Sequence, residues 1–389
     1  MSALNAFYGA QIFDGNVLLD QAWMVTEKDR IVDLGQGRRP RLRIRWRDIK
    51  GKLILPGLVD LHSDALEKCI EMRPGVRFAN DFSLLNLDTR LAACGITTYC
   101  HGISFADTEF GLRSCQSARN LSRLVHTLER RGNGKVKHLV HIRYEISYVE
   151  AVETILELIE EGVVDVLSVM DHTPGQGQFR DMESYVRYAT GTFGVTREEV
   201  VRVTEKRCEK REKGLRSLGA LTDAAREKGI PILSHDDDSV EKVRFVRSIA
   251  AVASEFPVTM EAAKEASNVG MLVFMGAPNL VRDCSSNGNL RASEALKAGV
   301  CDGLVSDYYP ECLIQAIFLA NRRGLMGIER ALALGTASPG GLLRRRQFAG
   351  RLAPGGPADF VLVDATEPWV NVLETWVSGQ CVYASKQPI

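Results

Sequence analysis

The chain has 389 residues, of which 45% are hydrophobic and 25% are charged, a balance typical of globular proteins rather than of disordered or fibrous ones. Lysine plus arginine equals aspartate plus glutamate at 49 each, so no net field draws the whole molecule to nucleic acid or to an anionic membrane, and we expect neither partner. Nine cysteines without a Cys-x-x-Cys pair argue against a disulfide framework and a zinc knuckle. Because we find no leader-like or membrane-spanning apolar stretch, we expect a cytoplasmic protein.

Both ends of the chain have the pattern of short β-strands. Alternating apolar positions broken by Gly and Asp turns fill the first 54 residues, and the runs GRLAPGGPADFVLVD and VLETWVSGQCVYA repeat this pattern near the end. We therefore predict a small β-sandwich domain assembled from residues 1–54 and 345–389.

The middle of the chain, residues 55–344, alternates apolar runs with amphipathic helical stretches, which is typical of repeated βα units. Eight runs are candidate strands: LILPGLVDLH, ITTYCHGI, KHLVHIRYEI, VVDVLSVMDH, PILSHDD, VTMEA, GMLVFMGAPN and DGLVSDYYP. The pattern predicts an α/β fold, a (β/α)8 barrel of the TIM type. In such barrels the chemistry occurs at the C-terminal ends of the strands.

One stretch, residues 175–217, is longer than an ordinary crossover and ends in the charge-dense run TREEVVRVTEKRCEKREKGLRS. Alternating charges usually indicate an exposed helix of mixed surface charge, which is the favoured interpretation. The alternative is a lid insertion that closes over an anionic substrate.

Metal-ligating side chains gather at the predicted strand ends. His62 and Asp64 are two residues apart at the end of the first strand, so an extended backbone would direct both to one face. Further donors follow other strands: His101, His141, Glu145, Asp171, His172, His235, Asp236, Asp237, Asp238 and Asp307. Such a convergence of like charges is costly unless cations neutralise it. Imidazoles with carboxylates suit one or two divalent ions, with zinc favoured over manganese or iron. His126 and His138 are expected to have ordinary structural roles.

Basic side chains also lie on or just after the strand ends: Lys68, Arg73, Arg143 and Arg282. Arginine and lysine are the usual partners of phosphoryl oxygens, and the Gly175–Gln178 loop could add backbone N–H groups. Arg143 is the best candidate because it alternates in phase with His141 and Glu145. The alternative for each basic residue is a salt bridge to one of the many carboxylates.

Several motifs resemble a known family over nearly the full length of the chain. PGLVDLH, the strand-end histidines His172 and His235, Asp307 and the terminal GRLAPGGPADFVLVD resemble the amidohydrolase superfamily. Within it, HSDALEK, HIRYEIS, SVMDHTPGQGQF, LSHDDD and SDYYP resemble the diphosphatases that act on alpha-D-ribose 1-methylphosphonate 5-triphosphate in the carbon-phosphorus lyase pathway of phosphonate use.

The resemblance implies a metal site made of His62, Asp64, Glu145, His172 and His235, with Asp307 as the catalytic acid/base. It also implies that a small phosphorylated sugar is cleaved to its 5-phosphate plus diphosphate. The candidate substrate contacts are Lys68, Arg143, Gln176, Arg282 and Asn289. A homodimer is the assembly that the resemblance suggests, although the sequence identifies no interface.

One motif departs from the family. The chain reads Ser-Ser-Asn-Gly-Asn over Ser285–Asn289 where the family carries Ser-His-Ser-Gly-Asn, so the histidine is replaced by Ser286 and the exact substrate stays open.

Two other functions fit the same barrel. One is hydrolysis of a carbon-nitrogen bond in a cyclic amide or N-acyl compound, whose neutral pocket would not require Arg143 and Arg282 to point inward. The other is a non-catalytic scaffold, which the retained ligand residues argue against.

Overall fold

The structure is a computed structural model that describes residues 4–73, 75–106, 114–173, 182–285, 288–343 and 347–385. Gln176 and Ser286, which the sequence singles out, lie outside the described residues. Among the described helices, none has the length and apolarity needed to cross a membrane.

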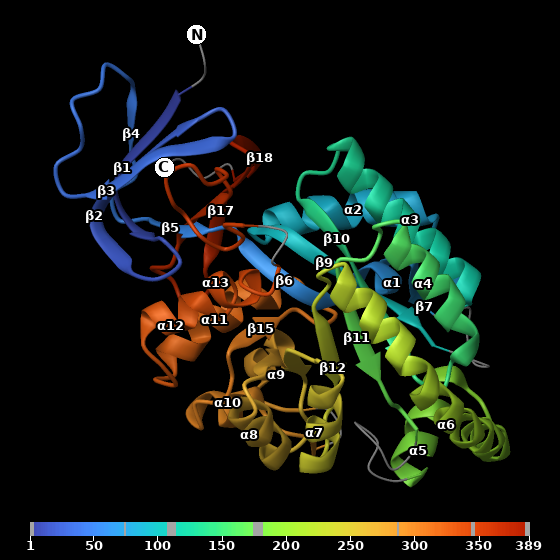
Figure 1. The fold of residues 1–389 in the computed structure, drawn as a ribbon. Helices are drawn as coiled ribbons and strands as arrows, with labels where there is room; N and C mark the ends of the chain where they lie inside the picture. Colours follow the sequence, from blue (N-terminus) through green and yellow to red (C-terminus); the bar gives the residue numbers. More distant parts are fainter. Residues whose placement is uncertain are drawn as a thin grey trace.

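Eight parallel strands form the predicted (β/α)8 barrel, which confirms the fold class (Figure 1). Seven of the pairings follow chain order. The remaining gap, between the first and eighth strands, is closed by an isolated parallel bridge between Ser63 and Asp307. The strands are β6 (Leu58–Ser63), β9 (Ile96–Phe105), β10 (Lys137–Glu145), β11 (Val166–Met170), β12 (Ile232–His235), β13 (Ala253–Glu255), β14 (Leu272–Gly276) and β15 (Gly303–Val305).

Two strand predictions were wrong in detail. The run from Leu53 to His62 is not one strand: β5 (Leu53–Pro56) belongs to the terminal sheet, and β6 begins the barrel after Gly57. A Cβ atom at Gly57 would lie 2.1 Å from Thr97 Oγ1, so only glycine fits where the chain changes sheets. The sixth strand is Ala253–Glu255 rather than VTMEA, because Thr259 caps the next helix through a hydrogen bond from the Ala262 N–H.

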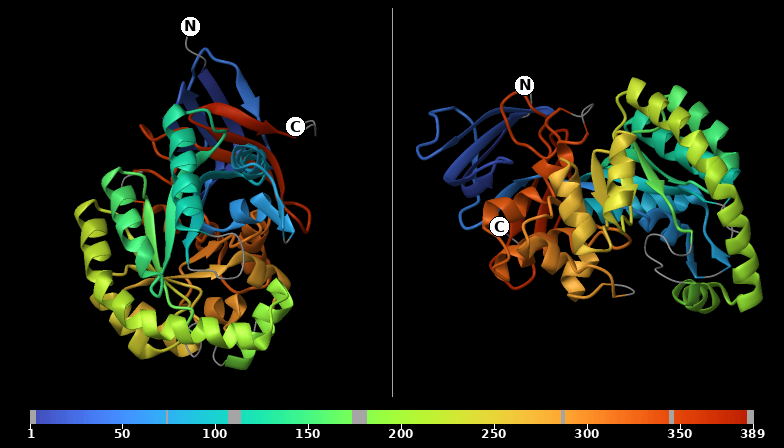
Figure 2. Two further views of the ribbon diagram at one scale, coloured as in Figure 1. Left: turned by 90° about the vertical axis from the view of Figure 1, so that its right-hand side faces the viewer. Right: turned by 60° about the horizontal axis from the view of Figure 1, so that its bottom comes forward.

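Helices surround the barrel and connect its strands. Their lengths are uneven, and the long α6 lies on the side of the barrel away from the terminal strands (Figure 2). They are α1 (Ala65–Ile70), α2 (Asn80–Ala93), α3 (Cys115–Arg131), α4 (Val152–Glu160), α5 (Met182–Phe193), α6 (Arg197–Glu227), α7 (Val240–Ser248), α8 (Met260–Asn268), α9 (Ala277–Arg282), α10 (Ala292–Lys297), α11 (Cys312–Arg322), α12 (Ile328–Ala333) and α13 (Ala337–Gly340). A 3-10 turn, η1 (Val149–Ala151), and a small hairpin of β7 (Glu71–Arg73) and β8 (Val76–Arg77) complete this part.

The charge-dense stretch is helical, as predicted. α6 begins with a capping box, in which the Thr196 side chain accepts the Glu199 N–H and the Glu199 carboxylate accepts the Thr196 N–H. Its middle approaches the barrel so closely that a Cβ atom at Gly214 would lie 1.6 Å from the Ile146 carbonyl oxygen. This part of α6 is therefore packed on the barrel. Closure of the insertion over a substrate stays a prediction.

Strands from both ends of the chain form a second, separate sheet. β5 pairs in parallel with β1 and antiparallel with β16, and thereby joins the N-terminal strands to the C-terminal ones. Apolar side chains that include Phe7, Ile12 and Phe360 form its own core. The strands are β1 (Leu4–Phe13), β2 (Leu18–Glu27), β3 (Arg30–Gln36), β4 (Trp46–Asp48), β5, β16 (Phe360–Asp364), β17 (Asn371–Val377) and β18 (Gln380–Ala384).

His101 does not lie at the barrel mouth, which corrects the expectation that it joins the metal donors. Its neighbour Cys100 belongs to the barrel interior, so the alternation along β9 directs His101 outward. There, His101 Nε2 lies 2.8 Å from His138 Nδ1, and His138 Nε2 lies 3.1 Å from Asp88 Oδ1 on α2. Both histidines are buried. They bind the barrel wall to the helical layer.

Burial lowers the pKa of His101 well below its ordinary value of 6.5, and His138 acts in the same direction. A group whose pKa is lower in the folded state favours folding above its unfolded pKa, and this contribution is lost as the pH falls. We therefore predict that the wild-type protein loses stability below about pH 6.5 more steeply than His101→Gln does. Denaturant midpoints measured between neutral and mildly acidic pH would reveal the difference. Parallel pH profiles of the two proteins would contradict the prediction.

Candidate metal centre at the mouth of the barrel

The alternation of side chains along the strands builds the site in layers. One hydrophobic cluster fills the barrel with a side chain from each of its strands: Val59, Cys100, Leu139, Val166, Leu233, Ala253, Phe274 and Val305. Because side chains two residues apart share a face, the next position along most of these strands faces the same interior. That layer is polar and contains His141, Ser168, His235, Glu255 and Asp307.

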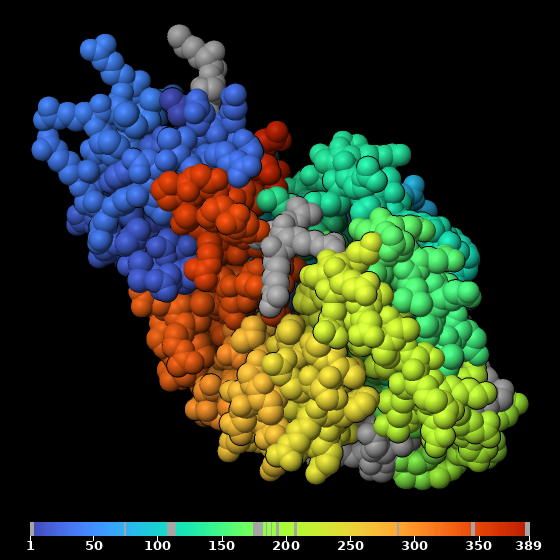
Figure 3. Space-filling view, in the orientation of Figure 1, coloured from blue at the N-terminus to red at the C-terminus, as the bar shows by residue number. Residues whose placement is uncertain are grey.

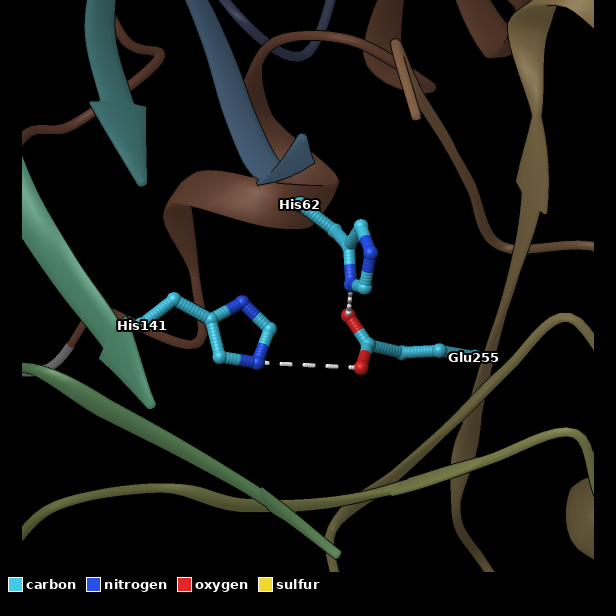
Figure 4. Close-up of side chains that lie close together, drawn as sticks. All are labelled: His62, His141 and Glu255. Atoms are coloured by element: carbon cyan, nitrogen blue, oxygen red, sulfur yellow. Dashed lines mark hydrogen bonds and ion pairs between the residues drawn. The ribbon is translucent and has the colours of Figure 1, made fainter. Parts of the chain in front are cut away.

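A first group of residues that could hold a metal ion lies deep in this layer. His62 Nδ1 is 3.0 Å from Glu255 Oε1, and His141 Nε2 is 3.8 Å from Glu255 Oε2 (Figure 4). The Ser168 hydroxyl donates a hydrogen bond to the same carboxylate. Burial lowers the pKa of His62 well below its usual range and that of His141 to about 4, so both imidazoles are neutral and each has a lone pair to offer.

His62 reaches this group because β6 is irregular. Regular alternation after Leu61 would turn Ser63 inward, but the pairing of β6 with β9 shifts register between Asp60 and Ser63. The His62 ring instead packs 5.1 Å from those of both His141 and His235, measured between ring centroids. His62 therefore stands at the centre of the site.

A second group surrounds His172, which follows β11. His172 Nδ1 is 2.9 Å from Glu145 Oε2, and His172 Nε2 is 3.1 Å from Asp236 Oδ2. His235 Nδ1 lies 3.0 Å from the same Asp236 oxygen. Burial alone would lower the pKa of His172, but hydrogen bonds to Asp236 and Glu145 raise it to about 9. The two carboxylates thus hold a proton on the His172 ring, which a divalent ion bound to that ring would displace.

Asp64 and Asp307 meet at the seam that closes the barrel. The Asp307 N–H donates to the His62 carbonyl oxygen (3.0 Å), and the Asp64 N–H donates to the Asp307 carbonyl oxygen (2.6 Å). Burial and the negative charge of Asp64 raise the pKa of Asp307 to about 7, while the Arg143 guanidinium acts in the opposite direction. Asp307 is thus suited to exchange a proton near neutral pH.

Three residues at the strand ends adopt left-handed backbone conformations that are uncommon outside glycine. Asp236, Phe256 and Asp307 have φ angles of 54°, 55° and 59°. Each N–H donates to a carbonyl oxygen of an adjacent strand, from Glu255, Phe274 and His62 respectively, at 2.8 to 3.0 Å. Each turn bends the chain away from its strand at the level of the site, which places local strain where the ligands are aimed.

Lys242 on α7 supports the turn at Asp236. Its side chain is only 10% exposed, and Nζ donates to the carbonyl oxygens of His235 and Asp236, both at 3.0 Å. The ammonium group thereby satisfies two carbonyls that the left-handed turn removes from regular strand pairing. We infer that Lys242 positions the His235 and Asp236 side chains.

The structure brings most of the sequence-predicted site residues together. His62, Asp64, Glu145, His172, His235 and Asp307 lie at the barrel mouth, with Arg143 Nη2 only 3.2 Å from His235 Nε2. Lys68 on α1 is close enough to lower the pKa of Asp307, and Arg282 bonds to the Tyr308 side chain beside Asp307. Asn289 has a buried Oδ1 atom for which the described residues provide no hydrogen-bond donor.

Glu255 was missed, because the strand that carries it was misplaced. Its signal was the alternation Ala253, Ser254, Glu255, in which a carboxylate follows a small apolar residue by two positions. Asp236 was noted among the donors but omitted from the predicted ligand set.

The donor set suits a divalent cation. Two groups, His62 with His141 and Glu255, and His172 with His235 and Asp236, each have ligand atoms within 4.8 Å of one another. His141 Nε2 and Asp64 Oδ1 are buried, and neither has a hydrogen-bond partner in the described parts of the chain. Buried polar atoms without partners are costly, and a bound cation would satisfy them.

Solved structures share this fold. One is an amidohydrolase with a TM-score of 0.64 and 13% sequence identity, matched over 99% of this chain and 100% of that chain. Another is N-acetyl-D-glucosamine-6-phosphate deacetylase from Mycobacterium smegmatis in complex with N-acetyl-D-glucosamine-6-phosphate, with a TM-score of 0.66 and 13% identity over 98% and 99% of the two chains. The barrel with its terminal sheet is therefore an amidohydrolase fold.

Sequence comparison narrows this class. No family model matches the chain. Alpha-D-ribose 1-methylphosphonate 5-triphosphate diphosphatase of Escherichia coli K12 is 31% identical over 342 residues, which cover 86% of this chain and 89% of the relative. The chain belongs to the family of that diphosphatase, and it shares its fold with amidohydrolases.

Replacing Lys242 tests its positioning role. We predict that Lys242→Met weakens divalent-metal binding about tenfold, because the His235 and Asp236 carbonyls lose their donor and the two side chains lose their orientation. Competition of the metal-free protein with a chromophoric chelator measures the affinity. Lys242→Arg should restore part of it, and Lys264→Met, which removes an exposed lysine from α8, should leave it unchanged. If Lys242→Met binds the metal as tightly as the wild type, Lys242 does not position the His235 and Asp236 side chains.

Proposed function

We propose that this protein is a metal-dependent diphosphatase that hydrolyses alpha-D-ribose 1-methylphosphonate 5-triphosphate to the 5-phosphate plus diphosphate. The observation that carries the proposal is the Arg143 guanidinium beside the candidate ligands, with Nη2 3.2 Å from His235 Nε2 and close enough to Asp307 to lower its pKa. The activity named for the 31% identical relative supports the same reaction.

The orientation of Arg143 favours a phosphorylated substrate over a neutral amide. Its stem crosses β9 where a Cβ atom at Gly102 would lie 3.1 Å from Arg143 Cδ, so the glycine leaves room for the arginine to turn inward. The Arg143 side chain is partly buried, and no carboxylate among the described residues forms a salt bridge with it. A triphosphate would supply several anionic oxygens in the right geometry for its guanidinium. With Lys68 and the exposed Arg282 at the rim, positive groups flank Asp307 on more than one side.

The residues that would hold a divalent ion, zinc in the first instance, are His62, Asp64, Glu145, His172 and His235. The structure adds Asp236, His141 and Glu255 as candidates, since they complete the two groups of clustered donors. An ion bound among them would act as a Lewis acid toward a water molecule and a phosphoryl oxygen.

Asp307 would act as the general base toward the attacking water. Its carboxylate faces the same space as Asp64, Arg143 and Asp236, and its raised pKa allows it to accept a proton from the attacking water. Arg143 would hold the triphosphate oxygens and balance the charge that develops on the departing diphosphate. The buried apolar layer below the site closes the barrel to water from the other end.

Removing the proton acceptor tests this assignment. We predict that Asp307→Asn keeps its metal content and loses turnover by a factor of about 10² to 10⁴, because asparagine preserves the shape and the backbone bonds but cannot accept the proton. The rate of diphosphate release and the metal-to-protein ratio are the two measurements. Asp283→Asn, a change at an exposed left-handed residue after α9, is the matched control and should retain full activity.

Wild-type turnover in Asp307→Asn would refute the role of Asp307. A metal-loaded wild-type protein that releases no diphosphate would refute the proposed function itself.

A further inference from the structure

The loop that joins β3 to β4 carries an unusual concentration of arginine. The segment from Leu34 to Arg47 contains six arginines, no lysine and no acidic residue. Because the whole chain has zero formal net charge, this local excess is invisible in the overall balance. A loop with this composition has a strong local positive potential.

Five of the six arginines face solvent. Arg38, Arg39, Arg41, Arg43 and Arg45 are exposed, and within the described ranges none of them forms a salt bridge. Arg47, in contrast, is neutralised by two hydrogen bonds to the Glu374 carboxylate, at 2.8 and 2.6 Å. The five charges are therefore available to a partner.

The base of the loop is held by aromatic rings. The Arg39 guanidinium lies 4.1 Å above the Tyr8 ring and 5.3 Å from that of Trp46, which packs edge-on against both Tyr8 and Trp23. Arginine stacks well on such rings and keeps its N–H groups free for an anion. The stack anchors one end of the charged loop.

The loop projects from the terminal sheet, at the end of the molecule away from α5 and α6 (Figures 1 and 3). A convex loop has no pocket for a small anion such as the proposed triphosphate substrate. It suits an extended chain of negative charges, to which several arginines can bind at the same time.

We propose that the exposed arginines Arg38, Arg39, Arg41, Arg43 and Arg45 bind the phosphodiester backbone of single-stranded RNA without sequence preference. Arginine rather than lysine is the residue whose planar fork matches phosphate oxygens in pairs. A backbone that repeats its phosphates can engage several of these forks at once and release its counterions. This activity is independent of the hydrolytic site.

Two other classes of partner fit less well. In the loop only Leu42 is a largely exposed apolar side chain, at 47%, which buries too little area to anchor the loop in a lipid surface. A stable protein interface normally has an apolar, well-packed centre, and this loop presents charges around a single leucine.

The probe is a fluorescent oligouridine that is longer than the roughly 4–16 nucleotides that a single-strand-binding domain covers. Its binding is measured by fluorescence anisotropy between about 50 and about 200 mM salt. The variant Arg41→Glu, Arg43→Glu, Arg45→Glu leaves the Arg39 stack in place. We expect it to weaken binding at least about tenfold and to reduce the salt slope by about 2, since each phosphate contact contributes about 0.7. The matched control reverses three exposed helix arginines, Arg130→Glu, Arg131→Glu and Arg226→Glu, and should bind nearly as well as the wild type.

Several results would overturn the proposal. These are the absence of oligouridine binding by the wild type, an equal loss in the control variant, or tighter binding to phosphatidylserine vesicles than to oligouridine. Diphosphate release and the melting temperature should be unchanged in the loop variant, which separates this proposal from the proposed hydrolase function and excludes misfolding.

Discussion

The structure depends on the hydrogen bonds that close the barrel between its first and eighth strands. The Asp307 N–H bonds to the His62 carbonyl, and the Asp64 N–H bonds to the Asp307 carbonyl. The backbones of three candidate functional residues therefore form the seam itself. Their side chains meet only if the barrel closes in this register, so the fold and the site form together.

The layered barrel explains why one face of the molecule is reactive. Apolar side chains fill the barrel interior, and a step of two residues along half of the strands reaches a histidine or a carboxylate: His141, His235, Glu255 and Asp307. The left-handed turns at Asp236, Phe256 and Asp307 end this alternation and bend the chain away. Lys242 then holds the carbonyls of one such turn. The layers make the mouth of the barrel polar, and the turns fix the direction in which its side chains point.

Much of this could be predicted from the sequence, because alternation and strand-end histidines are local signals. The barrel, the β-strands at both termini and the cluster around His62 and His172 follow from such signals. Three features did not. Ala253–Glu255 is too short to show a strand pattern. His101 points outward because Cys100 faces the barrel interior, and only the register of the sheet reveals which of the two residues faces inward. The division of the Leu53–His62 run depends on the close approach of Thr97 to Gly57, a contact between distant segments.

Acidic and basic side chains lie close together in the candidate site. Carboxylates, imidazoles and the partly buried Arg143 guanidinium lie together at the barrel mouth, an arrangement that is costly without ligands to complete it. A divalent ion would neutralise the carboxylates, and a triphosphate would neutralise the arginine.

Phosphorus NMR of the metal-loaded protein with alpha-D-ribose 1-methylphosphonate 5-triphosphate tests the proposed reaction most directly. We predict that the triphosphate resonances disappear as those of diphosphate and a 5-phosphate ester grow together. Stepwise release of single phosphates, or an unchanged spectrum, would contradict it.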